Sequence, residues 1–359
     1  MKQIRSTSNS QPVVEVVDNE KAVIALYDGT ISVVYLTKNK FLSNKLEAEA
    51  VQISIHGSHL YVLTKPFPIE VKDDEENEEV LAINMLAAKK TGITLWKLEI
   101  GENEISVVGK RQNTGGFAIY DQKIFACNPL EEGFYVLDLK LNEIERVGIT
   151  IKPTNRKPWF SSIFIIDSIL YLFQDENVIR WFRINDQISE GGILVPENRH
   201  VTNFVSLNKS PKKLIKAGDY IIGTLDSNQS FLIDFNESTP YVVNDPSEFI
   251  DLKYKESYTF SKKIQANTGH YALAINRYVI TIADTKLSEI QYAFCLSSAE
   301  DTLNLSRINA SDNFAICYAW TYDRKFPIVI LDMADPKMPK IHTVINLGGD
   351  IKGLTIEED

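Results

Sequence analysis

Short apolar runs recur along the chain at intervals of about ten to fifteen residues, separated by Gly, Asp, Asn or Pro. Residues 23–27 and 30–35, rich in β-branched and aromatic side chains, flank Asp28-Gly29. An Asp-Gly pair readily adopts the positive φ angles of a two-residue hairpin turn, so this segment predicts a β-hairpin. Residues 80–90 are the one stretch with helical character. The pattern therefore predicts an all-β fold.

The predicted strands also repeat as a unit. Seven times, a turn residue precedes an apolar run by no more than about three positions. These turns begin at Asp18, Gly57, Asp121, Asp167, Gly218, Asn276 and Asp312. A second apolar strand follows each run, and three of these strands carry an Asp at the same place, namely Asp138, Asp234 and Asp332. Seven units over 359 residues average about 51 residues each, close to the ~40–50 residues of a four-stranded propeller blade.

We therefore predict that residues 1–359 form a single β-propeller, with seven blades of four antiparallel strands and with six or eight blades as alternatives. The alternative fold is a pair of β-sandwich domains, which have similar short strands. No linker divides the chain and the period continues through its middle, which favours the propeller. We expect terminal strands to close the ring: one of two strand-like segments, residues 13–17 or 350–356, should complete the blade that holds residues 23–35, so that both ends of the chain build it.

The last unit carries a resemblance to a known repeat. Residues 327–340 read Pro-Ile-Val-Ile-Leu-Asp-Met-Ala-Asp-Pro-Lys-Met-Pro-Lys, which is an apolar strand, an Asp and a D-P-x-x-P turn. This segment resembles the LVIVD repeat, and residues 349–355 are similar to the small residues that precede the next inner strand in that family. The resemblance covers about residues 326–355 and implies a propeller fold without adding a catalytic residue. The Gly-His and Trp-Asp signatures of the WD40 class are absent from the sequence.

Composition limits the partners and the compartment. The formal net charge of −10 argues against bulk binding to nucleic acid or to an anionic membrane, because both favour a cationic surface. Cys127, Cys295 and Cys317 lie far apart, so we expect neither a disulfide framework nor a CxxC metal site. The N-terminal residues do not resemble a secretory signal and no apolar run has the length of a membrane span, so we expect a cytoplasmic or nuclear protein.

Candidate catalytic and metal-binding groups are sparse. His56 and His59 have the spacing of a metal-binding pair, but they straddle a turn with no neighbouring Cys or third His. We therefore interpret them as part of an ordinary exposed turn. The three cysteines lie in apolar strands, where a thiol acts as a small hydrophobic group. The sequence contains no nucleophile elbow, phosphate loop or dinucleotide-binding motif, and we expect neither a cofactor nor a bound metal.

The longest predicted connections would share one face of the propeller. They span residues 65–92, 150–159, 196–214 and 241–263. The first contains an acidic insertion in the second blade, residues 66–91, whereas the second and third are basic. Loops on a rigid frame often carry function, so this is the expected working face. The partner-binding candidates are Asp73, Asp74, Glu75 and Glu76 in the insertion and Arg156, Lys157, Trp159, Lys212 and Lys213 in the basic loops. Alternatively, Trp159 packs between blades at the start of an inner strand.

Two functions from different classes fit the sequence. The first is a non-enzymatic scaffold whose loop-rich face docks a protein partner within a larger assembly. The net charge and the lack of a stacked aromatic pattern disfavour RNA or a phosphoinositide at the basic loops. The alternative is a propeller enzyme or small-molecule binder with a site at the mouth of the central channel. Candidate residues for that site, near predicted inner-strand ends, are His270, Asn276, Asp312 and Asp350. Three or more convergent ionisable groups there would favour the enzyme.

Overall fold

The computed structural model describes residues 12–26, 28–38, 40–66, 93–127, 133–149, 160–174, 178–194, 213–217, 220–224, 230–234, 241–243, 264–276, 278–285, 290–298, 303–322, 325–347 and 353–358. All structural statements below concern these residues. Every regular element within them is a β-strand, which confirms the predicted all-β class. The stretch with helical character, residues 80–90, lies outside this part of the chain.

The strands form seven antiparallel sheets in the described part of the chain, numbered here in chain order. The first sheet contains β1 (Pro12–Val17), β2 (Lys21–Leu26), β3 (Thr30–Tyr35) and β4 (Lys40–Lys45). The second contains β5 (Glu49–His56), β6 (His59–Lys65), β7 (Thr94–Ile100) and β8 (Ile105–Gln112). The third contains β9 (Phe117–Tyr120), β10 (Lys123–Cys127), β11 (Gly133–Asp138) and β12 (Glu143–Gly148).

The remaining four sheets follow the same plan, with each strand paired to the next one along the chain. The fourth sheet contains β13 (Phe160–Ile166), β14 (Ile169–Gln174), β15 (Val178–Ile184) and β16 (Ile188–Leu194). The fifth contains β17 (Lys213–Ala217), β18 (Tyr220–Thr224), β19 (Ser230–Asp234) and β20 (Tyr241–Val243). The sixth contains β21 (Ile264–Asn267), β22 (Ala272–Asn276), β23 (Val279–Ala283), β24 (Ile290–Ser297) and, as a fifth strand, β29 (Thr355–Glu358). The seventh contains β25 (Asn304–Ala310), β26 (Phe314–Trp320), β27 (Phe326–Asp332) and β28 (Lys340–Leu347).

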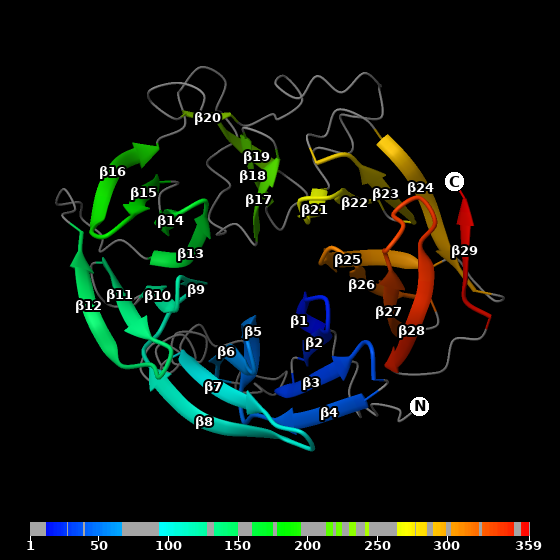
Figure 1. Cartoon of the computed structure of the whole chain (residues 1–359), viewed down its shortest axis with the longest axis horizontal. Coiled ribbons are helices and arrows are strands. Elements are labelled where there is room, and N and C mark those ends of the chain that lie inside the picture. The colour runs from blue at the N-terminus through cyan, green and yellow to red at the C-terminus, as the bar shows by residue number, and fades with distance from the viewer. Residues whose placement is uncertain are drawn as a thin grey trace, which may run out of the picture.

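The sheets are arranged as a closed ring. Their first strands, β1, β5, β9, β13, β17, β21 and β25, lie innermost around a central axis (Figure 1). Each first strand contacts the first strand of the next sheet, and β25 contacts β1. A ring of small antiparallel sheets around an axis is the β-propeller architecture. The seven sheets seen among the described residues equal the number of blades that the sequence repeat predicts.

The ring closes between the seventh and first sheets through packing and hydrogen bonds. Apolar side chains of β2 and β3 form one core cluster with those of β26 and β27. The Nε2 atom of His342, on β28, lies 2.7 Å from the carbonyl oxygen of Leu36. The backbone N–H of Asn313 donates to Oδ1 of Asn19 over 3.3 Å. These contacts join the first and last sheets, and none of the strands in the described ranges is shared between the two.

The C-terminal strand corrects the predicted closure. β1 completes the first sheet, but β29 pairs with β24 in the sixth sheet, with Ile356 opposite Leu296. The segment at residues 13–17 thus completes the first sheet, as one of the two predicted alternatives, but among the described residues this sheet consists of residues 12–45, so the prediction that both chain ends build it is wrong. The LVIVD resemblance implies an inner strand after residues 349–355, whereas the strand described there is β29, the outermost strand of its sheet. The edge of β24 offers backbone groups for pairing, and Ile356 and Leu354 pack against the core there.

The predicted repeat is visible as equivalent turns. Six of the seven predicted turns fall between the first and second strands of a sheet, and they begin at Asp18, Gly57, Asp121, Asp167, Gly218 and Asp312. Gly218 itself lies outside the described residues. Asn276 is out of phase, because it ends the second strand of its sheet and the corresponding turn spans residues 268–271. The error arose because β22 and β23 are both apolar and joined by a short turn.

Hydrogen bonds give these repeats the same local geometry. In four sheets, an N–H at the end of the third strand or directly after it donates to a carbonyl of the first turn at 2.7 to 2.9 Å. The pairs are Leu36 with Glu20, Ile100 with Ser58, Ile184 with Ser168, and Met333 with Asn313. The predicted equivalent aspartates each end a third strand, and Oδ1 of Asp138 accepts the N–H groups of Lys140 and Asn142 at 2.8 Å. An aspartate here caps the turn that follows.

The predicted hairpin at Asp28-Gly29 joins β2 to β3. Gly29 has a φ of 82°, and its N–H donates to the carbonyl of Leu26 over 3.1 Å. A Cβ at this position would overlap the carbonyl oxygen of Leu46, which follows β4. Glycine is therefore required both by the backbone angle and by the close approach of the neighbouring strand.

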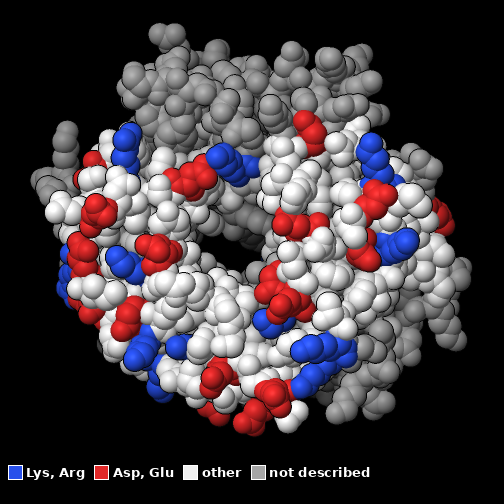
Figure 2. Space-filling model, viewed as in Figure 1, with Lys and Arg blue, Asp and Glu red and all other residues white. Residues whose placement is uncertain are grey.

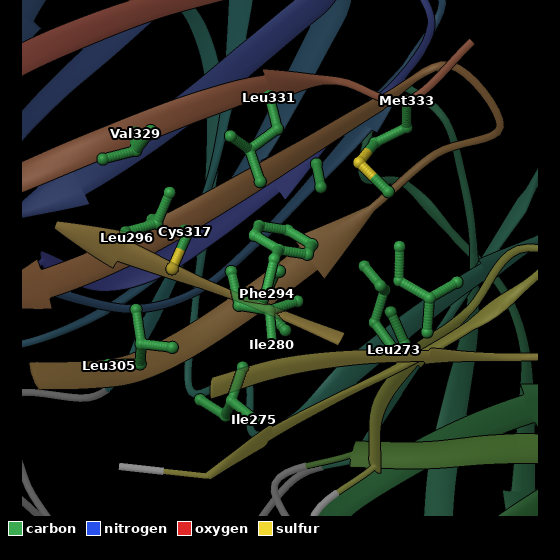
Figure 3. Close-up of a cluster of buried hydrophobic side chains, with 14 of the residues drawn as sticks. Leu273, Ile275, Ile280, Phe294, Leu296, Leu305, Cys317, Val329, Leu331 and Met333 are labelled. Atoms are coloured by element: carbon green, nitrogen blue, oxygen red, sulfur yellow. The ribbon is translucent and has the colours of Figure 1, made fainter. Parts of the chain in front are cut away.

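The core lies between adjacent sheets, which explains why the inner strands read as continuous apolar runs. β2 and β6 are buried along most of their length, because both faces of a propeller sheet pack against neighbours. Figure 3 shows one such cluster between the sixth and seventh sheets. Phe294 and Leu273 of the sixth sheet meet Cys317 and Leu331 of the seventh, and all four are fully buried. Close packing of this kind makes the ring a firm frame for its loops.

Candidate interaction faces

Alternating strand directions divide the ring into two faces. Turns between first and second strands and between third and fourth strands lie on one face, called here the tight-turn face. Second strands lead to third strands, and each sheet leads to the next, on the opposite face, called here the loop-rich face. The four longest predicted connections run from β6 to β7, β12 to β13, β16 to β17 and β20 to β21. All four therefore join strand ends on the loop-rich face.

The predicted partner-binding side chains are not themselves described. Asp73, Asp74, Glu75, Glu76, Arg156, Lys157, Trp159 and Lys212 lie outside the described residues. Lys213 begins β17, and only its backbone is described. The strands on either side of the acidic insertion are hydrogen-bonded neighbours, with Thr64 opposite Thr94. The insertion is thus flanked by two adjacent strands of one sheet.

An aromatic pair on the loop-rich face was missed by the sequence analysis. Trp320 ends β26 and Tyr322 follows in the turn to β27, with ring centroids 5.6 Å apart and planes inclined at 76°. Tyr322 is 62% exposed and Trp320 is half-buried. Hydrogen bonds between Thr321 and Lys325, at 3.0 and 3.1 Å, close the turn below the rings. Exposed Trp and Tyr are enriched in protein interfaces. The sequence signal that could have found this pair is an apolar strand followed by two aromatic residues.

Ion pairs fix other side chains on the loop-rich face. Nζ of Lys65, at the end of β6, lies 3.0 Å from the buried carboxylate of Glu49 at the start of β5. Nζ of Lys45 lies 3.4 Å from Oδ2 of Asp28. The Lys45–Asp28 pair is solvent-exposed and contributes little to stability. Each pair links side chains from two neighbouring strand ends or turns on the loop-rich face. The pairs therefore restrain those side chains relative to each other.

The tight-turn face has a different electrostatic character. Its turn residues include the acidic side chains of Asp18, Glu20, Asp121, Asp167 and Asp312. Acidic groups gather around the central opening, and most basic side chains lie farther out (Figure 2). One ion pair, between Lys216 and Asp167, links the fifth and fourth sheets at this face. Among the described residues, acidic side chains are therefore more frequent than basic ones beside the opening on this face.

The candidates for an enzymatic site come together only in part. Nε2 of His270 lies 3.7 Å from Oδ2 of Asp312, which joins the first turns of the sixth and seventh sheets. Both side chains are well exposed to solvent. Asn276 ends β22, on the loop-rich face, and its side chain is not described, whereas Asp350 lies outside the described residues. His270 and Asp312 thus make an exposed two-residue pair on the tight-turn face.

The remaining histidines and cysteines fit structural roles. His56 and His59 flank the turn between β5 and β6, and Nε2 of His56 lies 3.3 Å from Oε1 of Gln122 in the next sheet. Partial burial and the positive charge of Lys97 lower the pKa of His59. Burial raises the pKa of Cys127 to about 12, and its thiol donates to the Gly116 carbonyl. Among the described residues, no group of three or more His, Cys, Asp or Glu side chains is placed to hold a metal ion.

Comparison with known proteins identifies the fold. No protein-family model and no curated protein matches the chain. Apo AztD from Citrobacter koseri is similar in structure with a TM-score of 0.54 and 13% identity, covering 96% of this chain and 98% of that one. BamB from Moraxella catarrhalis has a TM-score of 0.50 and 13% identity, with 88% and 83% covered. The computationally designed protein Ika8 has a TM-score of 0.51 and 9% identity, with both chains covered in full.

Identities this low show a shared fold and say nothing of a shared activity. In the described part of the chain, no helix has the length and apolar character needed to cross a membrane. The ring of sheets, its closure and the similar solved structures agree, and the chain is a β-propeller.

Proposed function

We propose that this propeller is a non-enzymatic scaffold that docks a protein partner on its loop-rich face within a larger assembly. The observation that carries the proposal is topological. The four longest connections in the sequence all join strand ends on the same face of a closed ring. Variable loops on a rigid frame are the common arrangement for recognition surfaces.

Two further features support docking on this face. The Trp320–Tyr322 pair offers exposed aromatic surface, which suits a central contact of a protein interface. The acidic insertion and the basic loops supply opposite charges on one face, so a partner with complementary charges would be oriented as it approaches. The overall net charge of −10 disfavours nucleic acid as that partner.

The proposal is tested by affinity purification of the tagged full chain from the cells that express it, followed by quantitative mass spectrometry. The test variant combines Asp73→Asn, Asp74→Asn, Glu75→Gln and Glu76→Gln, and a second variant carries Tyr322→Ala. The control combines Glu102→Gln and Glu104→Gln, two exposed acidic residues in the β7–β8 turn on the tight-turn face.

We expect a stoichiometric protein partner whose recovery falls at least about tenfold with either loop-rich-face variant. Recovery with the control variant should equal that of the unmodified chain. Equal recovery with all three variants, or a loss confined to the control, would place the contact elsewhere. Melting temperatures of the purified variants must agree within about two degrees, so that a loss of binding is not a loss of fold.

A further inference from the structure

A cavity of about 310 Å³ opens between the third and fourth sheets on the tight-turn face. One wall comes from the hairpin of β9 and β10, with Tyr120 and Phe125, and the other from the end of β15, with Ile184. The rim carries Asp121, Lys123, Asn185 and Asp186. The cavity thus opens on the face opposite to the one that carries the four long connections.

Packed aromatic and aliphatic side chains form part of the cavity lining. Phe125 is 1% exposed and belongs to the core cluster between the two sheets, and Tyr120 and Ile184 pack against that cluster. The N–H of Ile184 donates to the carbonyl of Ser168 over 2.8 Å, which holds the end of β15 against the first turn of its sheet. A side chain that enters the cavity therefore meets a preformed surface rather than a loop that must reorganise.

The rim of the cavity carries charged groups that are available to bind a ligand. Asp121, Asp186 and Lys123 are exposed, and within the described part of the chain no hydrogen bond or ion pair engages either carboxylate or the Lys123 ammonium. Asp121 is held in a tight turn, since it and Gln122 have φ angles of 45° and 61°. Two carboxylates and one ammonium give the rim a net negative charge, in line with the acidic centre of this face.

We propose that this cavity binds an arginine side chain presented by a partner protein. An aliphatic stem with a flat cationic head matches a lining that combines Tyr120, Phe125 and Ile184 with two carboxylates. The guanidinium donates in a planar fork and stacks on aromatic rings, which suits a rim that carries the Asp121 and Asp186 carboxylates beside Tyr120. The positive charge of Lys123 repels a bound guanidinium and therefore lowers the affinity of the cavity for it.

Other cationic groups match this site less well. A lysine ammonium is a compact, strongly hydrated charge that cannot bond two separated carboxylates while also stacking on an aromatic ring. An anionic or neutral group would leave the two rim carboxylates unneutralised as water is displaced. The guanidinium alone uses the carboxylates and the aromatic wall together.

The test measures binding of N-acetyl-L-arginine amide to the full chain by isothermal titration calorimetry at low ionic strength. This probe carries the side chain without free α-amino or α-carboxyl charges. N-acetyl-citrulline amide, its neutral isostere, and N-acetyl-lysine amide are the matched ligands, and free L-arginine is a further arm. The variants are Asp121→Asn with Asp186→Asn, Lys123→Gln, and Glu102→Gln with Glu104→Gln as the control for charge on the same face.

We expect the arginine amide to bind at least about tenfold more tightly than the citrulline and lysine amides. The double Asp→Asn variant should weaken binding at least about tenfold, the Lys123→Gln variant should tighten it, and the control should leave it unchanged. No measurable heat with the arginine amide, equal binding of citrulline, or insensitivity to the Asp121 and Asp186 changes would overturn the proposal. Tighter binding of free L-arginine than of its blocked form would also overturn it, because the site would then serve a free amino acid.

Discussion

His342 and Leu36 are 306 residues apart in sequence, yet Nε2 of the imidazole lies 2.7 Å from the Leu36 carbonyl oxygen. The contact joins the last sheet of the ring to the turn that follows β3 in the first. The ring of Phe314 packs edge-on against the same imidazole, with centroids 5.3 Å apart. Because the described strands include none shared between these sheets, such side-chain contacts help to secure the seam.

Replacing His342 with Ala is expected to lower the free energy of unfolding by about 1 kcal/mol, because the Leu36 carbonyl loses a donor and Phe314 loses a packing partner. Urea unfolding followed by tryptophan fluorescence measures this change. His270→Ala is the control, since His270 is exposed and its contact with Asp312 is open to solvent. Equal effects of the two substitutions would show that the seam does not depend on this bond.

Removing residues 354–359 should destabilise the sixth sheet without opening the ring. The truncation exposes the paired edge of β24 and uncovers the core cluster contacted by Leu354 and Ile356. We expect a lower melting temperature and concentration-dependent association, measured by calorimetry and light scattering. Because β29 and the His342 seam are in different sheets, the truncation and His342→Ala should have additive effects on stability. Strong non-additivity would mean that β29 takes part in closure after all.

Gly191 on β16 is predicted to tolerate no side chain. A Cβ there would overlap the indole ring of Trp181 on the paired strand β15. Gly191→Ala should therefore cost about 1–3 kcal/mol of stability, as for other overpacked sites. Gly148→Ala is the matched control, because a Cβ at Gly148 on β12 meets no atom within 4 Å. A neutral Gly191→Ala variant would contradict the position of Trp181.

Stability is expected to fall as the solution becomes alkaline. Burial, aided by the charge of Asp138, raises the pKa of Tyr61 to about 12, and burial also raises the pKa values of Tyr171 and Tyr271. A tyrosine with a raised folded-state pKa contributes stability below its unfolded pKa of about 10, and this contribution disappears as the pH rises through the folded value. Urea unfolding at pH values of about 9, 10 and 11 should show a progressive decrease.

Tyr61→Phe provides the control for the alkaline decrease. The Tyr61 hydroxyl donates to the carbonyl of Leu139 in the next sheet over 2.9 Å, so the variant should lose about 1 kcal/mol at neutral pH. The same variant should show a shallower decline above pH ~10, because one titrating group is gone. A decline equally steep in both proteins would assign the pH dependence to other groups.

The repeat was readable from sequence because each sheet reuses the same local chemistry. Asp138 and Asp332 end third strands and cap the turns that follow, and the Asp28-Gly29 pair makes a hairpin that only glycine permits. These signals depend on residues close together in the chain. At Asn276 the turn between the second and third strands, β22 and β23, was mistaken for the first turn of the sheet. Both strands are apolar, so the sequence pattern did not distinguish the two turns.

Features that depend on distant parts of the chain were not readable in the same way. The position of β29 depends on a free edge of β24, which the sequence does not display. The cavity between the third and fourth sheets joins Asp121 to Asp186 across 65 positions, and no local pattern links them. The partner-binding candidates in the long loops stay predictions, because strand periodicity says nothing about where loop side chains point.

Hydrogen exchange of the full chain, alone and bound to its purified partner, tests most directly whether the loop-rich face is the docking surface. We predict slower exchange in the complex across residues 66–93, 113–116 and 320–325, which lie between strand ends on that face. The first turns at residues 18–20, 57–58 and 311–313, on the tight-turn face and outside the cavity at Asp121, should exchange at unchanged rates. Protection confined to those first turns, with the loop-rich segments unaffected, would contradict the proposed mode of docking.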